Sequence, residues 1–126
     1  MMAIKRVLIV DDSPTERHVL NDMLTKAGYE VVASDNGEDA ILKAKTVKPD
    51  LILMDIELPD GNGLALTAWI KRNRRISSIP VVALTSHVRL DQRAAASEAG
   101  CAGFISKPIG GHRFVKQVEA YLAARE

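Results

Sequence analysis

Three aspartates and one lysine directly follow short apolar runs, and these four residues are the ones best suited to chemistry. Asp11 and Asp12 follow residues 7–10, Asp55 follows residues 51–54, and Lys107 follows residues 104–106. A fourth run, residues 81–84, ends in Thr85 and Ser86. Ligands of an open parallel sheet bind at the carboxyl ends of the strands. If the runs are neighbouring strands, all these polar side chains are expected to meet in one pocket.

The three acids predict a site for a divalent cation. Carboxylates that converge in a crevice repel one another unless a positive charge joins them. Mg²⁺ suits such a place because it takes oxygen ligands and keeps several waters, and Mn²⁺ is the second cation we expect the site to accept. Asp12 and Asp55 are expected as direct ligands and Asp11 as a ligand through water. No His or Cys lies near them in the sequence, which argues against zinc.

Lys107 and Thr85 add the other parts of a phosphoryl-transfer site. Lys107 is a compact positive charge suited to a phosphate or a carboxylate, and Thr85 offers a hydroxyl donor. A nucleophilic carboxylate with a metal, an ammonium group and a hydroxyl is typical of sites that form an aspartyl-phosphate. Taken singly, each residue is better explained as a helix cap, a surface charge or a turn. Their shared position after successive strands favours one pocket.

The elements that must position these residues alternate along the whole chain. Strands are expected at the four runs and at residues 29–33, and each is followed by a helical pattern. Helices are expected after Ser13, from Asn36 to Pro49, around Leu66 to Ile70, at about 90–99, and over Phe114 to Leu122. Near-continuous apolar strands predict a parallel sheet covered on both faces. We therefore expect an α/β, flavodoxin-like (βα)5 fold with strand order 2-1-3-4-5.

The first helix carries the clearest start signal. Ser13 can cap it, Pro14 suits the first helical position, and Glu16 is expected to complete a capping box. The apolar stripe is expected to contain Val19, Leu20, Met23, Leu24 and Ala27, and Gly28 ends the helix.

Composition excludes several classes of protein. The chain has 126 residues, 47% of them hydrophobic, and no apolar run near the ~20 residues that span a bilayer. We expect one domain over residues 1–126, no signal peptide and no membrane contact. The single cysteine, Cys101, allows no internal disulfide, suits the cytoplasm and is interpreted as a small filler at a helix end.

Nucleic acid is not an expected partner. The net charge is only +1, and the basic stretch of residues 71–75 has no interleaved aromatic residue for base stacking. It is interpreted as a solvated loop, with cations favoured at a helix C-terminus. Trp69 is interpreted as core or as partly exposed packing.

The chain resembles the receiver domain of two-component response regulators over essentially its whole length. The motifs are Val-Asp11-Asp12-Ser, Leu-Met-Asp55-Ile-Glu-Leu-Pro59-Asp-Gly-Asn-Gly63, Ala-Leu-Thr85-Ser86 and Ser-Lys107-Pro108. The resemblance implies that Asp55 accepts the phosphoryl group and that Thr85 and Lys107 contact it. It implies that Asp12, Asp55 and the backbone carbonyl of Glu57 bind Mg²⁺, with Asp11 in the second shell.

The resemblance also implies residues that change conformation on phosphorylation and residues that tune the rate of hydrolysis. Thr85 and Phe104 are the switch residues, although Phe104 lacks the hydroxyl of the tyrosine that is common there. Glu57 and His87 occupy the two positions thought to tune hydrolysis. Pro108 is a candidate for a cis peptide after the lysine.

The implied function is signalling, not enzymatic turnover. The phosphoryl donor would be a histidine kinase or a histidine phosphotransfer protein. The phosphorylated domain would act on a downstream protein through the face of its fourth helix, fifth strand and fifth helix. We expect a stand-alone receiver that is a monomer or a weak, phosphorylation-dependent dimer, because no output module follows the last helix. A piece of a larger protein is the alternative.

Two other functions stay open from the residues alone. A Mg²⁺-dependent phosphatase with an aspartyl nucleophile would place a general acid near Glu57, but 126 residues leave little room for a substrate cap. A receiver-like scaffold that is never phosphorylated is the other, and the intact set of site residues counts against it.

Overall fold

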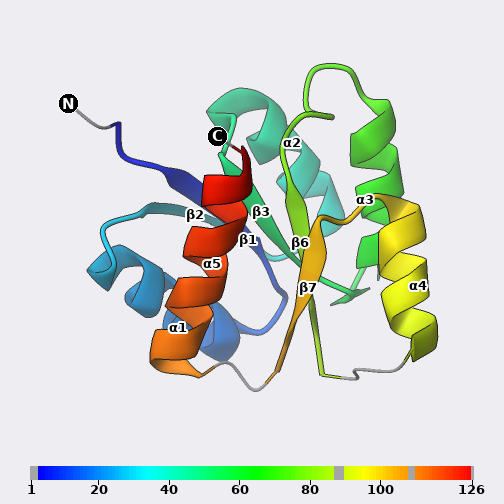
Figure 1. Cartoon of the computed structure of the whole chain (residues 1–126). Helices are drawn as coiled ribbons and strands as arrows, with labels where there is room; N and C mark the ends of the chain where they lie inside the picture. The colour runs from blue at the N-terminus through cyan, green and yellow to red at the C-terminus, as the bar shows by residue number, and fades with distance from the viewer. Residues whose placement is uncertain (1–2, 87–89, 108–109, 126) are drawn as a thin grey trace.

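The computed structural model describes residues 3–86, 90–107 and 110–125, which form a parallel sheet with helices on both faces (Figure 1). The main strands are β1 (Arg6–Val10), β2 (Glu30–Ser34), β3 (Leu51–Asp55), β6 (Val81–Thr85) and β7 (Gly103–Ser106). The helices are α1 (Pro14–Lys26), α2 (Gly37–Val47), α3 (Gly63–Arg72), α4 (Leu90–Ala99) and α5 (Gly111–Arg125). A small hairpin, β4 (Glu57–Leu58) and β5 (Gly61–Asn62), lies between β3 and α3.

The strand order of the sheet is β2-β1-β3-β6-β7, and every neighbouring pair is parallel. The predicted flavodoxin-like fold is confirmed. With the hairpin left out of the count, this is the order 2-1-3-4-5, and the labels differ because the hairpin was not predicted. Strands of two residues are too short to show a period-2 hydrophobic pattern, so the sequence gives no signal for them.

The sheet separates two hydrophobic cores. Successive side chains of a strand point to opposite faces. Val7 and Ile9 of β1 therefore pack with α1 and α5, whereas Leu8 and Val10 pack with α2 and α3. Every residue of β3 and β6 is buried, which explains their unbroken apolar runs. Strands held from both faces are a rigid base for the side chains at their ends.

Helix α1 begins as predicted but differs in three details, the first being that Ala27, predicted in the apolar stripe, is exposed and is the C-cap residue. The Ser13 hydroxyl accepts a hydrogen bond from the Glu16 amide, at 3.2 Å. The reciprocal half of the predicted capping box is wrong, because the Ser13 amide donates to Asp11 Oδ1 at 2.9 Å instead of to Glu16. Val19 was predicted in the buried stripe, but its side chain is 43% exposed, since the helix turns Leu20 and Leu24 toward the sheet.

Trp69 lies on the outer side of α3 and is partly exposed. Its side chain is 42% exposed, and the Lys45 ammonium of α2 lies 5.3 Å from the ring centroid. Of the two interpretations of Trp69, partly exposed packing is therefore correct and full burial is wrong.

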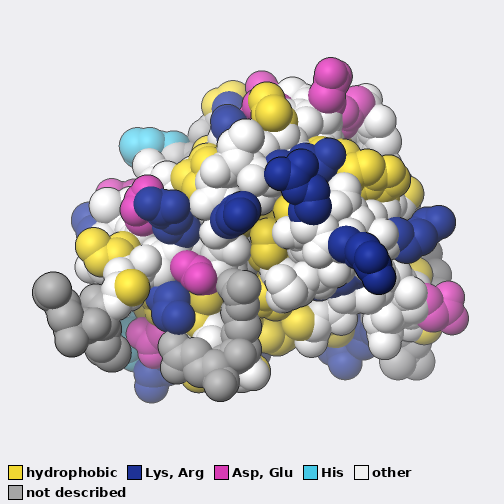
Figure 2. All heavy atoms as spheres, turned by 90° about the horizontal axis from the view of Figure 1, so that it is seen from above, with side chains coloured by type: hydrophobic (Ala, Val, Ile, Leu, Met, Phe, Trp, Pro, Cys, Tyr) yellow, Lys and Arg dark blue, Asp and Glu magenta, His cyan; other side chains and the backbone are white. Residues whose placement is uncertain are grey.

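Basic side chains gather at the end of the molecule opposite the carboxyl ends of the strands. Figure 2 views this end from above, and Lys and Arg side chains are prominent on it. Arg72, Arg74 and Arg75 are exposed there. Lys71 instead turns inward, and its ammonium donates to the carbonyl oxygens of Ser77 (3.2 Å) and Ile79 (2.6 Å). One cation of the basic stretch therefore closes the loop after α3.

None of the helices described in the chain is both long and apolar enough to cross a membrane.

Candidate functional site

The register of the sheet brings the predicted site residues together. Val10 pairs with Met54, Asp55 pairs with Leu84, and Thr85 pairs with Ser106. A cavity of about 260 Å³ lies at these strand ends and the start of α1. Its lining residues are Asp12, Ser13, Glu16, Asp55, Ile56, Glu57, Leu84, Thr85, Ser86 and Lys107. Neighbouring strands of one sheet thus supply a single pocket, as the sequence pattern predicted.

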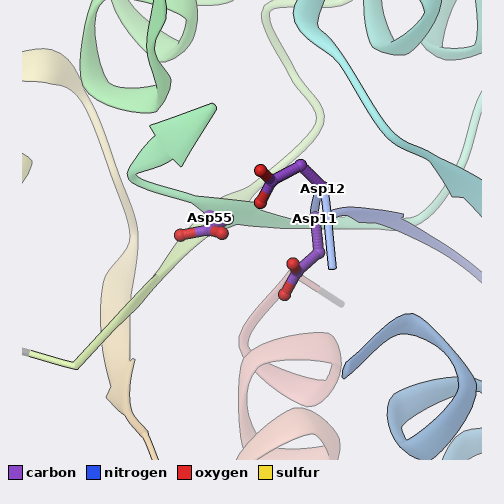
Figure 3. A group of neighbouring side chains, drawn as sticks. All are labelled: Asp11, Asp12 and Asp55. Carbon is purple, nitrogen blue, oxygen red and sulfur yellow. The ribbon is translucent and has the colours of Figure 1, made fainter. Parts of the chain in front are cut away.

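Three aspartate carboxylates form a cluster at this pocket. Asp11, Asp12 and Asp55 each place an oxygen within 4.8 Å of the others, and Figure 3 shows the three groups gathered beside the ends of β1 and β3. Asp11 is fully buried, Asp55 is 7% exposed and Asp12 is exposed. The exposure of the three carboxylates therefore increases from Asp11 through Asp55 to Asp12.

Burial works against the negative charge of the two inner acids. Burial, followed by the neighbouring carboxylate of Glu16, raises the pKa of Asp11 to about 7. Burial also raises the pKa of Asp55, although the nearby Lys107 charge and the Glu57 amide partly oppose it. The ionised forms of both acids are poorly solvated where they lie, so a positive charge bound beside them would stabilise these forms.

Lys107 supplies the positive charge among the described residues of the pocket. Its ammonium nitrogen lies 3.5 Å from Asp11 Oδ2, 3.5 Å from Asp55 Oδ2 and 2.6 Å from Glu16 Oε2. Burial acts to lower the pKa of Lys107, but the hydrogen bond with Glu16 and the charges of Asp11 and Asp55 together raise it. Three acids therefore surround the ammonium group of Lys107 and stabilise its charged form.

Glu16 is the site residue that sequence reasoning missed. The capping-box pattern assigned its side chain to the start of α1, whereas the structure places it in the pocket against Lys107. The pKa of Glu16 lies below its usual value. The largest cause is the hydrogen bond with Asp11; burial acts in the opposite direction, and Lys107 lowers the pKa further. Its short distance in sequence from the acid pair is the one available signal, since it lies four residues after Asp12 in the first turn of α1.

The hairpin after β3 fixes the position of Asp55. The Glu57 amide donates to Asp55 Oδ1 at 3.2 Å, and the Gly63 amide at the start of α3 donates to the Ile56 carbonyl at 2.7 Å. The Asp60 carboxylate at the hairpin tip accepts from the Gly37 amide at 2.9 Å. The loop that follows Asp55 is therefore attached to the first turns of both α2 and α3.

Thr85 and Phe104 lie on the neighbouring strands β6 and β7, two positions apart in register, because Phe104 pairs with Ala83 and Thr85 with Ser106. Thr85 is 6% exposed, and its carbonyl accepts from the Lys107 amide at 2.7 Å. Phe104 of β7 is half-buried, and the guanidinium carbon of Arg93 lies 4.5 Å from its ring centroid. Of the other predicted site residues, His87 and Pro108 lie outside the described residues.

The acidic cluster fits a hard divalent cation. Asp11 Oδ2 is buried and, among the described residues, has no hydrogen-bond partner. A buried oxygen of this kind needs a proton, a water or a cation. The group offers only oxygen ligands, within a span that one ion and its waters can bridge. Mg²⁺ or Mn²⁺ fits these ligands better than zinc does.

The comparisons with known proteins give one consistent result. The family model of the response regulator receiver domain matches residues 7–119. The polar-differentiation response regulator DivK of Brucella anthropi is 37% identical over 118 residues, which cover 94% of this chain and 96% of the relative.

Two solved structures extend this similarity to the fold. The chemotaxis protein CheY4 of Vibrio cholerae has a TM-score of 0.89 at 26% identity, covering 94% of this chain and 98% of that one. The receiver domain of a sensor histidine kinase of Pseudomonas aeruginosa, solved with a magnesium ion in its active-site cleft, has a TM-score of 0.87 at 27% identity over 96% and 99% of the two chains. This chain belongs to the response regulator receiver domain family.

Proposed function

We propose that this protein is a single-domain response regulator that is phosphorylated on Asp55 and that residues 1–126 form one receiver. The observation that supports it best is the position of Asp55, buried to 7% exposure at the floor of the pocket, with Lys107 3.5 Å away. The nucleophile, its neutralising charge and a cluster of metal-binding oxygens lie within one cavity.

The proposed step is a transfer between two amino-acid side chains. An Asp55 carboxylate oxygen attacks the phosphorus of a phosphohistidine on a histidine kinase or phosphotransfer protein. The new P–O bond forms as the P–N bond breaks, and the histidine nitrogen leaves and takes up a proton. In hydrolysis, water attacks the same phosphorus, and phosphate leaves as the Asp55 carboxylate is restored. The protein acts on its own side chain, which makes it a switch and not a turnover enzyme.

The neighbouring residues have separate tasks in this step. A divalent cation held by Asp12, Asp55 and the Glu57 carbonyl would neutralise charge on the phosphoryl oxygens, with Asp11 holding one of its waters. Lys107 contacts one phosphoryl oxygen through its ammonium group, and the Thr85 hydroxyl donates to another. Glu57, exposed at the pocket mouth, and His87 are proposed to set the rate at which water attacks.

The phosphorylated state is proposed to be transmitted to a downstream protein in the cytoplasm through α4, β7 and α5. As Thr85 moves toward the phosphoryl group, Phe104 moves into the space that is freed. Phe104 and Arg93 border a cavity of about 430 Å³ on this face, so a change at Phe104 alters a surface that a partner can contact. The protein is proposed to be a monomer or a weak dimer that forms on phosphorylation.

The direct test of the acceptor uses acetyl phosphate. The protein is incubated with acetyl phosphate and Mg²⁺, and its intact mass is measured. We expect the mass of one phosphoryl group on the wild type and none on Asp55→Asn. Full labelling of Asp55→Asn would show that another residue is the acceptor. Sustained turnover of small phosphate esters would favour a phosphatase instead.

The output face is tested by amide chemical shifts with and without beryllofluoride, a phosphoryl mimic. We expect shifts that extend from the loops around Asp12, Asp55 and Thr85 to described residues of 90–122. Shifts confined to those loops would mean that α4, β7 and α5 do not form the signalling surface.

A further inference from the structure

Glu16 makes the shortest of the three ion pairs of Lys107. The Lys107 Nζ–Glu16 Oε2 distance is 2.6 Å, against 3.5 Å for both Asp11 and Asp55. The lysine side chain is only 15% exposed, so water competes weakly for its ammonium group. Charge-assisted hydrogen bonds of this length are among the stronger polar contacts in proteins.

The local structure releases Glu16 for this contact. The Ser13 amide, which a capping-box glutamate would hold, already donates to Asp11 Oδ1. Glu16 lies in the first turn of α1, which keeps its backbone fixed by the Ser13 cap. Its carboxylate is left to cross the pocket and meet the residue that follows β7.

We propose that Glu16 is a positioning residue that binds the Lys107 ammonium in the unphosphorylated protein. Lys107 is then less available to a phosphoryl group that arrives on Asp55, and phosphoryl binding is weakened. This inference rests on the proposed function, in which Lys107 contacts the phosphoryl group on Asp55. A phosphoryl group brings close to two negative charges into the pocket. It must either break the Lys107–Glu16 contact or share the ammonium with Glu16 against repulsion, and both cost free energy.

The contact itself is tested without any phosphoryl chemistry. The metal-free protein is treated briefly with acetic anhydride, and acetylation of Lys107 Nζ is measured by peptide mass spectrometry. Glu16→Gln is expected to raise the acetylation rate of Lys107 several-fold, because the amine loses the nearest of the three acids that stabilise its protonated form. Glu57→Gln removes one charge from the same pocket and is expected to leave the rate unchanged. An unchanged rate in Glu16→Gln would overturn the proposed contact.

The functional consequence is tested by the affinity for beryllofluoride at saturating Mg²⁺. Glu16→Gln is expected to bind it roughly threefold to tenfold more tightly, which corresponds to one partly buried ion pair. Glu16→Asp keeps the charge but shortens the side chain by one methylene, so it should give a similar gain. In a Lys107→Ala background, Glu16→Gln should have no effect.

The remaining outcomes separate the two proposals. An equal gain with and without Lys107, or no gain from Glu16→Asp, would mean that Glu16 acts only as a general negative charge, and the inference fails. Equal beryllofluoride binding by wild type and Asp55→Asn would instead reject the proposed function. The acetylation result would then still report whether Glu16 holds Lys107.

Discussion

Two acids of this site are buried although cation binding requires their charged forms. Asp11 and Asp55 must stay ionised to bind a cation, yet both are buried where ionisation is disfavoured. Lys107 offsets part of this cost, and it is shared with Glu16. Asp12 differs because it is exposed and no comparable burial acts on it. The two kinds of carboxylate should therefore respond differently to substitution.

Replacement of Asp12 is expected to remove a direct metal ligand. Asp12→Ala should weaken Mg²⁺ binding on the order of tenfold to a hundredfold, because the partial cage loses one of few protein oxygens. Titration calorimetry or amide shifts would measure the affinity. Asp35→Asn, after the edge strand β2, is the control and should bind Mg²⁺ like the wild type. Unchanged binding by Asp12→Ala would contradict the ligand assignment.

Asp11 is expected to make stability depend on pH in the metal-free protein. Its pKa is about 7 in the folded state against 3.8 for an unperturbed Asp. The folded state thus holds a proton that the unfolded state has lost, so this group's contribution to the free energy of unfolding falls as pH rises from about 4 to about 7. Relative to wild type, Asp11→Asn should be more stable at pH 8 than at pH 5 by on the order of 2 kcal/mol.

Urea unfolding in a chelating buffer at the two pH values would measure this difference. An equal effect of Asp11→Asn at pH 5 and pH 8 would contradict it. Added Mg²⁺ should shrink the difference at pH 8, because bound metal stabilises the ionised carboxylate.

At the scale of elements, the sequence predicted what depends on local pattern and missed what depends on distant partners. The five main strands have apolar runs long enough to identify, and the polar residues after them were correctly placed in one pocket. The hairpin β4–β5 has no such run. Glu16 was assigned to its own helix because nothing in its neighbourhood indicates a lysine 91 positions away. Val19 was predicted to be buried and is exposed, whereas the next residue, Leu20, is buried. The apolar pattern of a helix therefore predicts its buried face only to within about one residue.

The approach of α3 to the end of β3 depends on Gly63. A Cβ at this position would lie 3.0 Å from the Ile56 Cα and closer still to the Asp55 carbonyl oxygen. Gly63→Ala is therefore expected to destabilise the fold by on the order of 2 kcal/mol and to weaken Mg²⁺ binding by displacing Asp55. Gly111→Ala, where a Cβ meets nothing within 4 Å, should change stability by less than about 0.5 kcal/mol. Chemical denaturation and metal titration of both variants would decide.

At the scale of the whole molecule, one sheet joins two cores. Leu53 and Met54 are adjacent in β3, both fully buried, and belong to different cores. Because the same backbone serves both faces, loss of one core is expected to disrupt the other. The described part of the chain is thus expected to unfold as one cooperative unit.

Paired core substitutions test this cooperativity. Leu53→Ala and Met54→Ala should each lower the free energy of unfolding by about 2–5 kcal/mol and leave a single transition. Circular dichroism and Trp69 fluorescence, which reports on the α2–α3 side, should give the same midpoint in each variant. Separate midpoints for the two probes would show that the cores unfold independently.

The 91-residue separation between Glu16 and Lys107 has a consequence for the order in which the protein is made. Asp11, Asp12, Glu16 and Asp55 are all synthesised before the lysine that offsets their charge. A nascent chain that has not reached β7 therefore carries these acids without their ammonium partner. Their mutual repulsion disfavours early closure of the pocket, so the site is completed only after Lys107 has left the ribosome.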